Sequence, residues 1–177
     1  MTSEHGEATA GASEGTRDAD VADAAGAEMS VQAGQEAADD AAAETPVERL
    51  HVALYSDDVD TRRTVMRAVG RRAAVDLPDV AWAEFATLPA LLRAVEAGGF
   101  DVLVLDGEAS PAGGMGVCRQ LKDEIFDCPP VLVLTGRPQD AWLAAWSRAE
   151  AAVPHPLDPR AVARAVAELA RLRVSVA

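Results

Sequence analysis

Several polar residues of this sequence stand directly after apolar runs. The clearest case is Asp106, which ends the run from Val102 to Leu105. Because that run has no polar alternation, it is typical of a strand buried on both faces of a parallel sheet. Ligands and chemistry collect beyond the carboxyl ends of such strands, so Asp106 is a candidate reactive group; the alternative is that it caps the following loop. Three other apolar segments are followed by polar residues: Ser56 to Asp58, Thr135 and His155.

Strands and helices are needed to bring these positions together, and the hydropathy pattern after residue 47 predicts them. We expect strands at 51–55, 80–85, 102–105, 130–135 and 151–153, and helices at 61–70, 88–97, 116–125, 138–149 and 158–172. The second strand is expected nearer an edge because Glu84 interrupts it. Five βα units in roughly 125 residues predict a flavodoxin-like, doubly wound α/β fold with a five-stranded parallel sheet. The carboxyl ends of strands one, three, four and five then meet at one edge.

The first 46 residues differ in composition from the rest. They hold eleven of the 29 acids and one base, Arg17, so they carry a net charge of -10 out of a total of -13. They contain no Phe, Trp or Tyr, and such a segment cannot bury enough apolar surface to offset the entropy of ordering. We therefore predict a disordered acidic tail over 1–46 and one domain over 47–177. The tail is interpreted as a solvating segment or, alternatively, as a docking arm for a basic partner.

The composition argues against several classes of protein. Negative charge on both segments disfavours nucleic acid as a partner. No basic leader and no apolar stretch of about 20 residues is present, so we expect neither a signal peptide nor membrane insertion and place the protein in the cytoplasm. Cys118 and Cys128 lack metal-site spacing. The sequence ends shortly after the last expected helix, so no DNA-binding output domain is expected to follow.

Over about residues 49–173 the pattern resembles the receiver domain of bacterial response regulators. In that family an aspartate at the end of the third strand accepts a phosphoryl group from a histidine kinase, and Asp106 in VLVLDGE matches it. Thr135 in VLVLTG matches the hydroxyl residue that contacts the phosphoryl group, and HPLDP matches the signature of the fifth strand. The stretch YSDDVDTRR matches the acids that hold magnesium. The resemblance thus implies these candidate Mg²⁺ ligands: Asp57, Asp58, Asp106 and Glu108.

The sequence departs from the family at several working positions. Ser56 stands at the first acidic position, and His155 replaces the lysine that pairs with the phosphoryl group. Glu108 is an extra acid two positions past the acceptor, Ala152 replaces the aromatic switch residue, and Pro111 falls one residue late. We therefore expect an atypical receiver that is not an enzyme and that works as a protein-interaction module. The alternative is a single-domain response regulator that takes phosphate on Asp106 with Mg²⁺.

Ordinary structural roles compete with these assignments. Asp57 and Asp58 are also favoured residues for capping a helix or turn. Thr135 is also a common β-branched strand residue. His155, between two prolines, is interpreted as a structural substitute that hydrogen-bonds a neighbouring acid, with a titrating sensor as the alternative. A flavodoxin-like cofactor binder is a third functional class, but SDDVDTRR stands where a glycine-rich phosphate loop would be needed.

The expected fourth helix carries the candidate interface. Trp142 and Trp146 lie four residues apart; we predict core packing for Trp142 and exposure for Trp146, with Arg148 beside them. In receivers, as the resemblance implies, the face of the fourth helix, fifth strand and fifth helix docks partners or a second subunit, so a homodimer is an alternative assembly. Arginines are expected to rim that face: Arg148, Arg160, Arg164, Arg171 and Arg173.

Four segments look closest to orphan actinobacterial receivers associated with the NADH-quinone oxidoreductase, respiratory complex I. These segments are YSDD, DGEASPAGGMG, LTGRP and AEAAVPHPLDP. The resemblance predicts a protein partner, either complex I or a histidine kinase, which would bring the chain to the inner face of the plasma membrane without inserting it.

Overall fold

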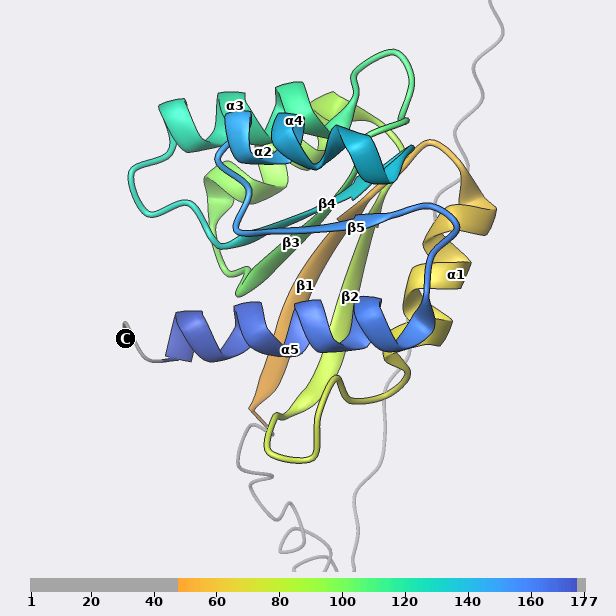
Figure 1. The fold of residues 1–177 in the computed structure, drawn as a ribbon. Helices are drawn as coiled ribbons and strands as arrows, with labels where there is room; N and C mark the ends of the chain where they lie inside the picture. Colours follow the sequence, from red (N-terminus) through yellow and green to blue (C-terminus); the bar gives the residue numbers. More distant parts are fainter. Residues whose placement is uncertain (1–47, 175–177) are drawn as a thin grey trace, which may run out of the picture. The chain divides into compact units, whose positions relative to one another are not determined.

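Five parallel strands form one sheet in the computed structural model, which describes residues 48–174 (Figure 1). The strand order is β2-β1-β3-β4-β5, so the predicted fold and the edge position of β2 are confirmed. The predicted tail over 1–46 lies outside the described residues. The strands are β1 (Arg49–Tyr55), β2 (Asp79–Phe85), β3 (Val102–Asp106), β4 (Val131–Thr135) and β5 (Ala151–Pro154).

Helices cover both faces of the sheet, α1 and α5 on one side and α2, α3 and α4 on the other (Figure 1). Within residues 48–174, every helix is too short or too polar to cross a membrane. The expected helix at 138–149 is shorter than predicted: a 3-10 turn at Pro138–Asp140 leads into a six-residue α4. The helices are α1 (Val59–Val69), α2 (Leu88–Ala97), α3 (Gly114–Glu124), α4 (Ala141–Trp146) and α5 (Pro159–Val174).

The sheet divides the interior into two apolar cores because successive side chains of a strand point to opposite faces. In β1, Val52 and Leu54 pack into the core beneath α1 and α5, whereas Ala53 and Tyr55 pack into the core beneath α2 and α3. All five residues of β3 and all five of β4 are buried. These two buried central strands therefore position Asp106 and Thr135, which are their last residues.

Close backbone packing fixes the loop that follows β3. A Cβ atom on Gly114, the first residue of α3, would lie 2.7 Å from the carbonyl oxygen of Asp106. Only glycine allows α3 to begin so close to the strand end. Gly107 is similarly tight, since its Cβ would lie 2.5 Å from the carbonyl oxygen of Leu134 in β4. The two glycines hold the β3–α3 loop at the carboxyl edge of the sheet.

Candidate functional site

A polar cleft of about 370 Å³ lies at the carboxyl edge of the sheet. It receives residues from the ends of β1, β3, β4 and β5, so the predicted convergence of these strand ends is observed. Thr135 ends β4 at this edge but is not among the lining residues. The cleft is lined by Asp57, Asp58, Thr61, Asp106, Glu108, Gly136 and His155.

Asp106 is held inside the protein by two donors. It is only 3% exposed, and its Oδ2 accepts a hydrogen bond from the Ser56 hydroxyl at 2.7 Å. Its Oδ1 accepts a second from the backbone N–H of Glu108 at 3.0 Å. Ser56 is fully buried, and its Oγ also accepts from the backbone N–H of Asp58 at 3.1 Å. A carboxylate with so little exposed surface needs such donors in place of most of its hydration.

Asp58 is the N-cap of α1, as the capping interpretation proposes. Its Oδ1 accepts from the backbone N–H of Asp60 at 3.0 Å, and its Oδ2 accepts from the backbone N–H and the hydroxyl of Thr61. These hydrogen bonds, first that from Asp60 and then that from the Thr61 hydroxyl, hold the pKa of Asp58 below its ordinary value. Both of its carboxylate oxygens therefore accept hydrogen bonds from the first turn of α1.

Asp57 and Tyr55 tie the end of β1 to the β3–α3 loop. Asp57 Oδ1 accepts from the backbone N–H of Ser110 at 3.1 Å, and the Tyr55 hydroxyl donates to the carbonyl oxygen of Ala112 at 2.9 Å. Burial, and then the negative charges of Asp57 and Asp106, raise the pKa of the Tyr55 phenol. The sequence pattern does not mark Tyr55 as a site residue; its only signal is a polar-tipped aromatic at the end of an apolar strand.

Arg62 is a second site residue without a sequence signal. It lies in α1, and its guanidinium donates to the carbonyl oxygen of Ser56 at 2.6 Å and to Glu84 of β2 at 2.9 Å. The Arg62 side chain is only 13% exposed. It therefore fixes the backbone at the residue whose hydroxyl holds Asp106.

On the β4 and β5 side of the cleft, the contacts of His155 differ from those predicted. Glu108 lies over Gly136, where a Cβ atom would come within 2.5 Å of the Glu108 carboxylate. The Thr135 hydroxyl donates to the carbonyl oxygen of Arg137 at 3.2 Å. His155 lines the cleft and donates its backbone N–H to Thr135. Its imidazole makes no hydrogen bond to any residue in 48–174, so the predicted bond to a neighbouring acid is wrong; the extended backbone, rather than an acid, positions this residue.

The predicted ligand set shares the cleft without forming a ready-made metal centre. Asp57, Asp58, Asp106 and Glu108 all line it. However, among the residues that the structure describes, no group of three or more His, Cys, Asp or Glu side chains is arranged to hold a metal ion. Asp58 is committed to α1 and Asp106 to Ser56. In this arrangement the carboxylates of Asp57 and Glu108 face solvent. Asp106 instead accepts hydrogen bonds from Ser56 and from the backbone of Glu108.

The candidate interface differs from the prediction at Trp142. Both indoles are exposed, Trp142 by 67% and Trp146 by 55%, so exposure of Trp146 is confirmed and core packing of Trp142 is wrong. The physical reason is the shortness of α4, in which the buried Ala144 and half-buried Leu143 supply the packed face. Arg148 follows with a left-handed φ of 64°, a conformation that ends the helix.

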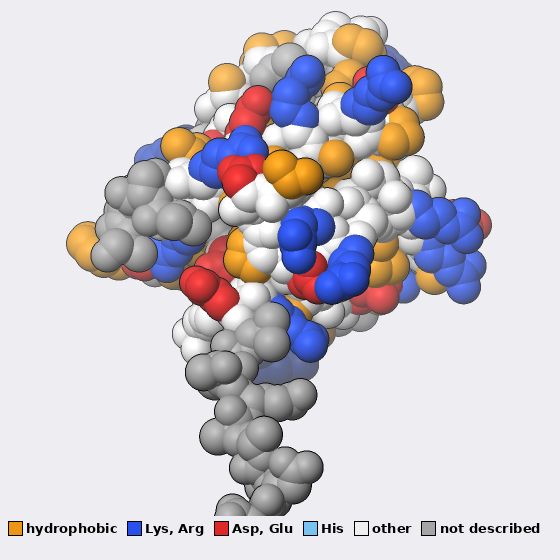
Figure 2. All heavy atoms as spheres, turned by 90° about the horizontal axis from the view of Figure 1, so that it is seen from below, with side chains coloured by type: hydrophobic (Ala, Val, Ile, Leu, Met, Phe, Trp, Pro, Cys, Tyr) orange, Lys and Arg blue, Asp and Glu red, His pale blue; other side chains and the backbone are white. Residues whose placement is uncertain are grey.

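The expected arginine rim is dispersed. Arg148 pairs with Asp123 of α3, while Arg171 pairs with Asp76. Arg173 pairs with Asp127 in the loop after α3. Arg160 and Arg164 are exposed on α5. Figure 2, seen from below the orientation of Figure 1, shows Lys and Arg side chains spread over that side with acidic side chains beside some of them.

Comparison with known proteins supports the fold and shows relatives of this chain. No family model matches the chain. Two relatives from Mycobacterium tuberculosis, of strains CDC 1551 / Oshkosh and H37Rv, are each named an uncharacterized response regulatory protein. Each is 58% identical over 122 residues, which cover 69% of this chain and 92% of the relative.

Solved structures share the fold at low identity. The receiver domain of the Francisella response regulator 1452 superposes with a TM-score of 0.59 at 14% identity, covering 69% of this chain and 97% of that chain. The CheY-like receiver domain protein of Methanospirillum hungatei gives 0.59 at 13% identity, covering 73% and 100%.

Proposed function

This chain belongs to the response regulatory proteins and carries a receiver domain, and from that membership we propose that it is an atypical receiver that regulates by binding another protein. In this proposal Asp106 keeps the acceptor position but is not stably phosphorylated. The chain performs no turnover of its own. It acts through a surface that binds a partner protein.

The hydrogen bond between Ser56 and Asp106 carries the proposal. A hydroxyl donor at 2.7 Å occupies Oδ2 of the carboxylate that would have to attack phosphorus. The Glu108 N–H occupies Oδ1 at 3.0 Å. Both oxygens of Asp106 thus already accept a hydrogen bond in a residue that is 3% exposed, and each donor draws electron density from the oxygen that would attack. Hydrogen bonds to charged groups are stronger than those between neutral groups, so this arrangement favours the resting carboxylate.

The donor set of the cleft fits Mg²⁺ poorly. Magnesium requires near-octahedral oxygen ligands and usually takes one or two carboxylates along with phosphate oxygens. Here Ser56 contributes a hydroxyl whose proton points to Asp106, and Asp58 is occupied by the start of α1. Asp57 and Glu108 remain, both of them lining the cleft. We therefore derive no step of the proposed function through a metal ion.

Phosphorylation can be tested directly on the full chain. Wild type, Asp106→Asn and Ser56→Asp are incubated with acetyl phosphate and Mg²⁺, and intact masses are measured. We expect no phosphoryl group on wild type. Ser56→Asp restores an acid beside Asp106 and serves as the control in which a gain is expected. A gain of one phosphoryl group in wild type that Asp106→Asn abolishes would refute the proposal.

A phosphoryl gain in wild type that Asp106→Asn abolishes would favour the second candidate. This candidate is a single-domain response regulator that takes phosphate from a histidine kinase. One observation favours it: Asp106 and Asp57 share a cleft that is open to solvent. In this candidate Asp57 and Glu108 would hold Mg²⁺, which would neutralise charge on the equatorial phosphoryl oxygens. His155 would face the phosphoryl group in place of lysine, and Thr135 would have to turn away from the Arg137 carbonyl.

As partner we propose the respiratory NADH-quinone oxidoreductase, reached from the cytoplasmic side. The support is the resemblance of the four segments quoted above to receivers associated with that complex. A tagged full-length chain is retrieved from native membranes and from cytosol of its host. Recovery of subunits of the oxidoreductase from the membrane fraction is expected, whereas recovery of a histidine kinase alone would favour the second candidate.

A further inference from the structure

We propose that the α3–α4 face, defined as Arg119, Trp142, Trp146 and Arg148, docks an amphipathic protein segment that carries acidic side chains beside its apolar ones. The inference rests on the proposed function, a receiver that acts by binding protein, and names the surface and the chemistry of the partner. It differs from the predicted face of α4, β5 and α5 in using α3 as its second wall.

The two indoles form a stripe along α4. Trp142 and Trp146 are four residues apart, which places them on one side of the helix, and more than half of each residue is exposed. Trp146 lies against α3, because the Arg119 guanidinium sits 5.7 Å from the centre of its ring and donates to its carbonyl oxygen at 3.2 Å. The Trp146 end of the stripe thus lies beside α3.

The charges around the stripe select an acidic partner. Arg119 and Arg148 both pair with Asp123, each at 2.9 Å, so two guanidinium groups share one carboxylate. One positive charge is left in surplus at the Trp146 end. Before the other end of α4, the sequence carries one base, Arg137, and one acid, Asp140, so its formal charges sum to zero. A docking segment therefore fits best with apolar side chains over both indoles and its acids near Arg119 and Arg148.

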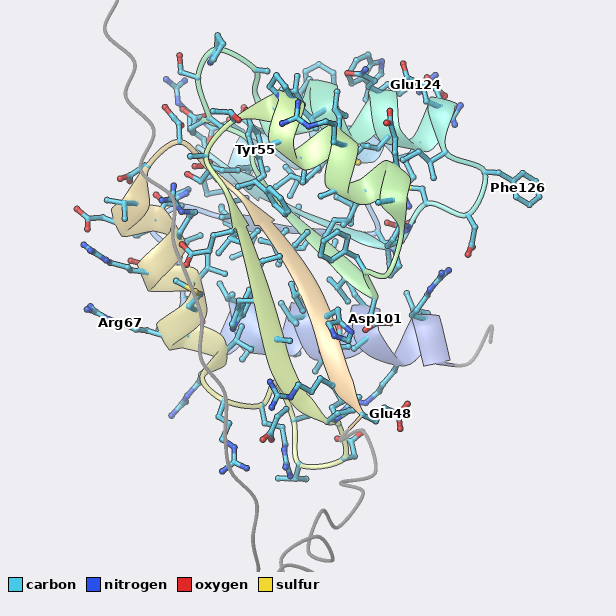
Figure 3. The ribbon with its side chains drawn as sticks, turned by 180° about the vertical axis from the view of Figure 1, so that it is seen from behind. Glu48, Tyr55, Arg67, Asp101, Glu124 and Phe126 are labelled. Carbon is cyan, nitrogen blue, oxygen red and sulfur yellow. The ribbon has the colours of Figure 1, made fainter. Side chains whose placement is uncertain are left out.

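α5 contains no aromatic residue, and the large apolar side chain that it exposes is Leu172. Arg173 is tied to Asp127 through two hydrogen bonds of 2.8 and 2.7 Å, and Arg171 is tied to Asp76 by two of 2.9 Å. Arg164 is exposed on α5, and within residues 48–174 the one cation–π contact is that of Arg119 with Trp146. Phe126 is a fully exposed aromatic, yet it projects from the loop after α3 at the amino edge of the sheet (Figure 3). These two positions are therefore matched controls.

The first experiment places a photo-activated cross-linking amino acid at one position of the full chain, in living cells of the host. Positions 142 and 146 probe the face, and positions 164 and 126 are the controls. We expect one adduct at 142 and 146 that is weak at the controls, and the cross-linked peptide should combine apolar residues with a net negative charge. Adducts at 164 alone, a basic peptide, or adducts to a second copy of this chain would overturn the inference but not the proposed function. Adducts at no position would count against both.

The second experiment measures affinity with a synthetic peptide of the cross-linked segment. Trp142→Ser and the double variant Trp142→Ser/Trp146→Ser are expected to weaken binding at least tenfold, because aromatic anchors dominate interfaces. Phe126→Ser should change it less than twofold. Arg148→Glu should weaken binding and reduce its dependence on salt. Equal effects of the tryptophan and Phe126 variants would refute the inference, and circular dichroism checks that each variant is folded.

Discussion

Replacing Ser56 by alanine removes the hydroxyl that holds Asp106 and leaves the backbone of the cleft in place. Ser56 is fully buried and Asp106 is 3% exposed, so bulk water contributes little to the hydrogen bonding of this carboxylate. A hydrogen bond to a charged group contributes about 1.5–3 kcal/mol to stability, and an unpaired buried acceptor costs the same order. The N–H of Asp58, 3.1 Å from the hydroxyl, also loses its acceptor.

We therefore expect Ser56→Ala to lower the free energy of unfolding by about 2–3 kcal/mol, which corresponds to a fall in melting temperature of roughly 5–12 °C for a domain of this size. Urea unfolding at neutral pH, followed by far-ultraviolet circular dichroism, gives this difference. The slope of the unfolding free energy against urea should be unchanged, because the buried surface is the same.

A double-mutant cycle isolates the interaction itself. In Asp106→Asn the acceptor is neutral, so Ser56→Ala should then cost only about 1 kcal/mol, and the coupling between positions 56 and 106 should be about 1–2 kcal/mol. If Ser56→Ala costs less than about 0.5 kcal/mol, or costs the same in both backgrounds, then the hydroxyl does not stabilise the carboxylate. The physical basis of the proposed function would be lost with it.

Three further changes test neighbouring parts of the structure. Tyr55→Phe removes the hydrogen bond to Ala112 and should cost about 1 kcal/mol, with faster amide hydrogen exchange confined to the β3–α3 loop. Burial raises the pKa of the Cys118 thiol from 9.0 to about 11; since the folded pKa is the higher one, its contribution is present below pH 9 and is lost as the pH rises toward 11. Wild type should therefore lose roughly 2 kcal/mol more than Cys118→Ala over that range in urea unfolding. Arg148→Gly relieves the left-handed φ and should be about 1 kcal/mol more stable than Arg148→Ala in thermal unfolding, since both lose the Asp123 ion pair.

The fold follows from patterns that sequence displays directly. Runs such as 102–105 and 131–134 are fully buried strands, and the break at Glu84 indicates the edge strand β2. The length of α4 does not follow in this way, because residues 141–149 continue a helical pattern. After the left-handed Arg148, which ends the helix, the chain is held by bonds to distant residues: Glu150 accepts from the backbone N–H of Val131 and from Lys122, 19 and 28 positions away. Such long-range contacts override local propensity.

For the site too, the positions of the residues could be predicted, but their hydrogen-bond partners could not. Topology dictates that strand ends meet, so the approach of Asp57, Asp106 and His155 was predictable. The partners of each side chain were not, because they depend on rotamers and on loops that no periodicity describes. The bond from Ser56 to Asp106 joins residues 50 positions apart. Glu108 turns toward Gly136 because that residue lacks a side chain, and no pattern around residue 108 specifies that direction.

Three acids of the cleft, Asp57, Asp58 and Asp106, accept hydrogen bonds from donors of the protein itself. Backbone N–H groups serve Asp57 and Asp58, from Ser110 and from the first turn of α1. Among the described residues, Ser56 is the only side chain that donates to Asp106. An acid at position 56 would instead put a second negative charge beside that carboxylate, and two such groups cannot both stay ionised at low cost without a cation. Serine at position 56 instead supplies a proton to that carboxylate.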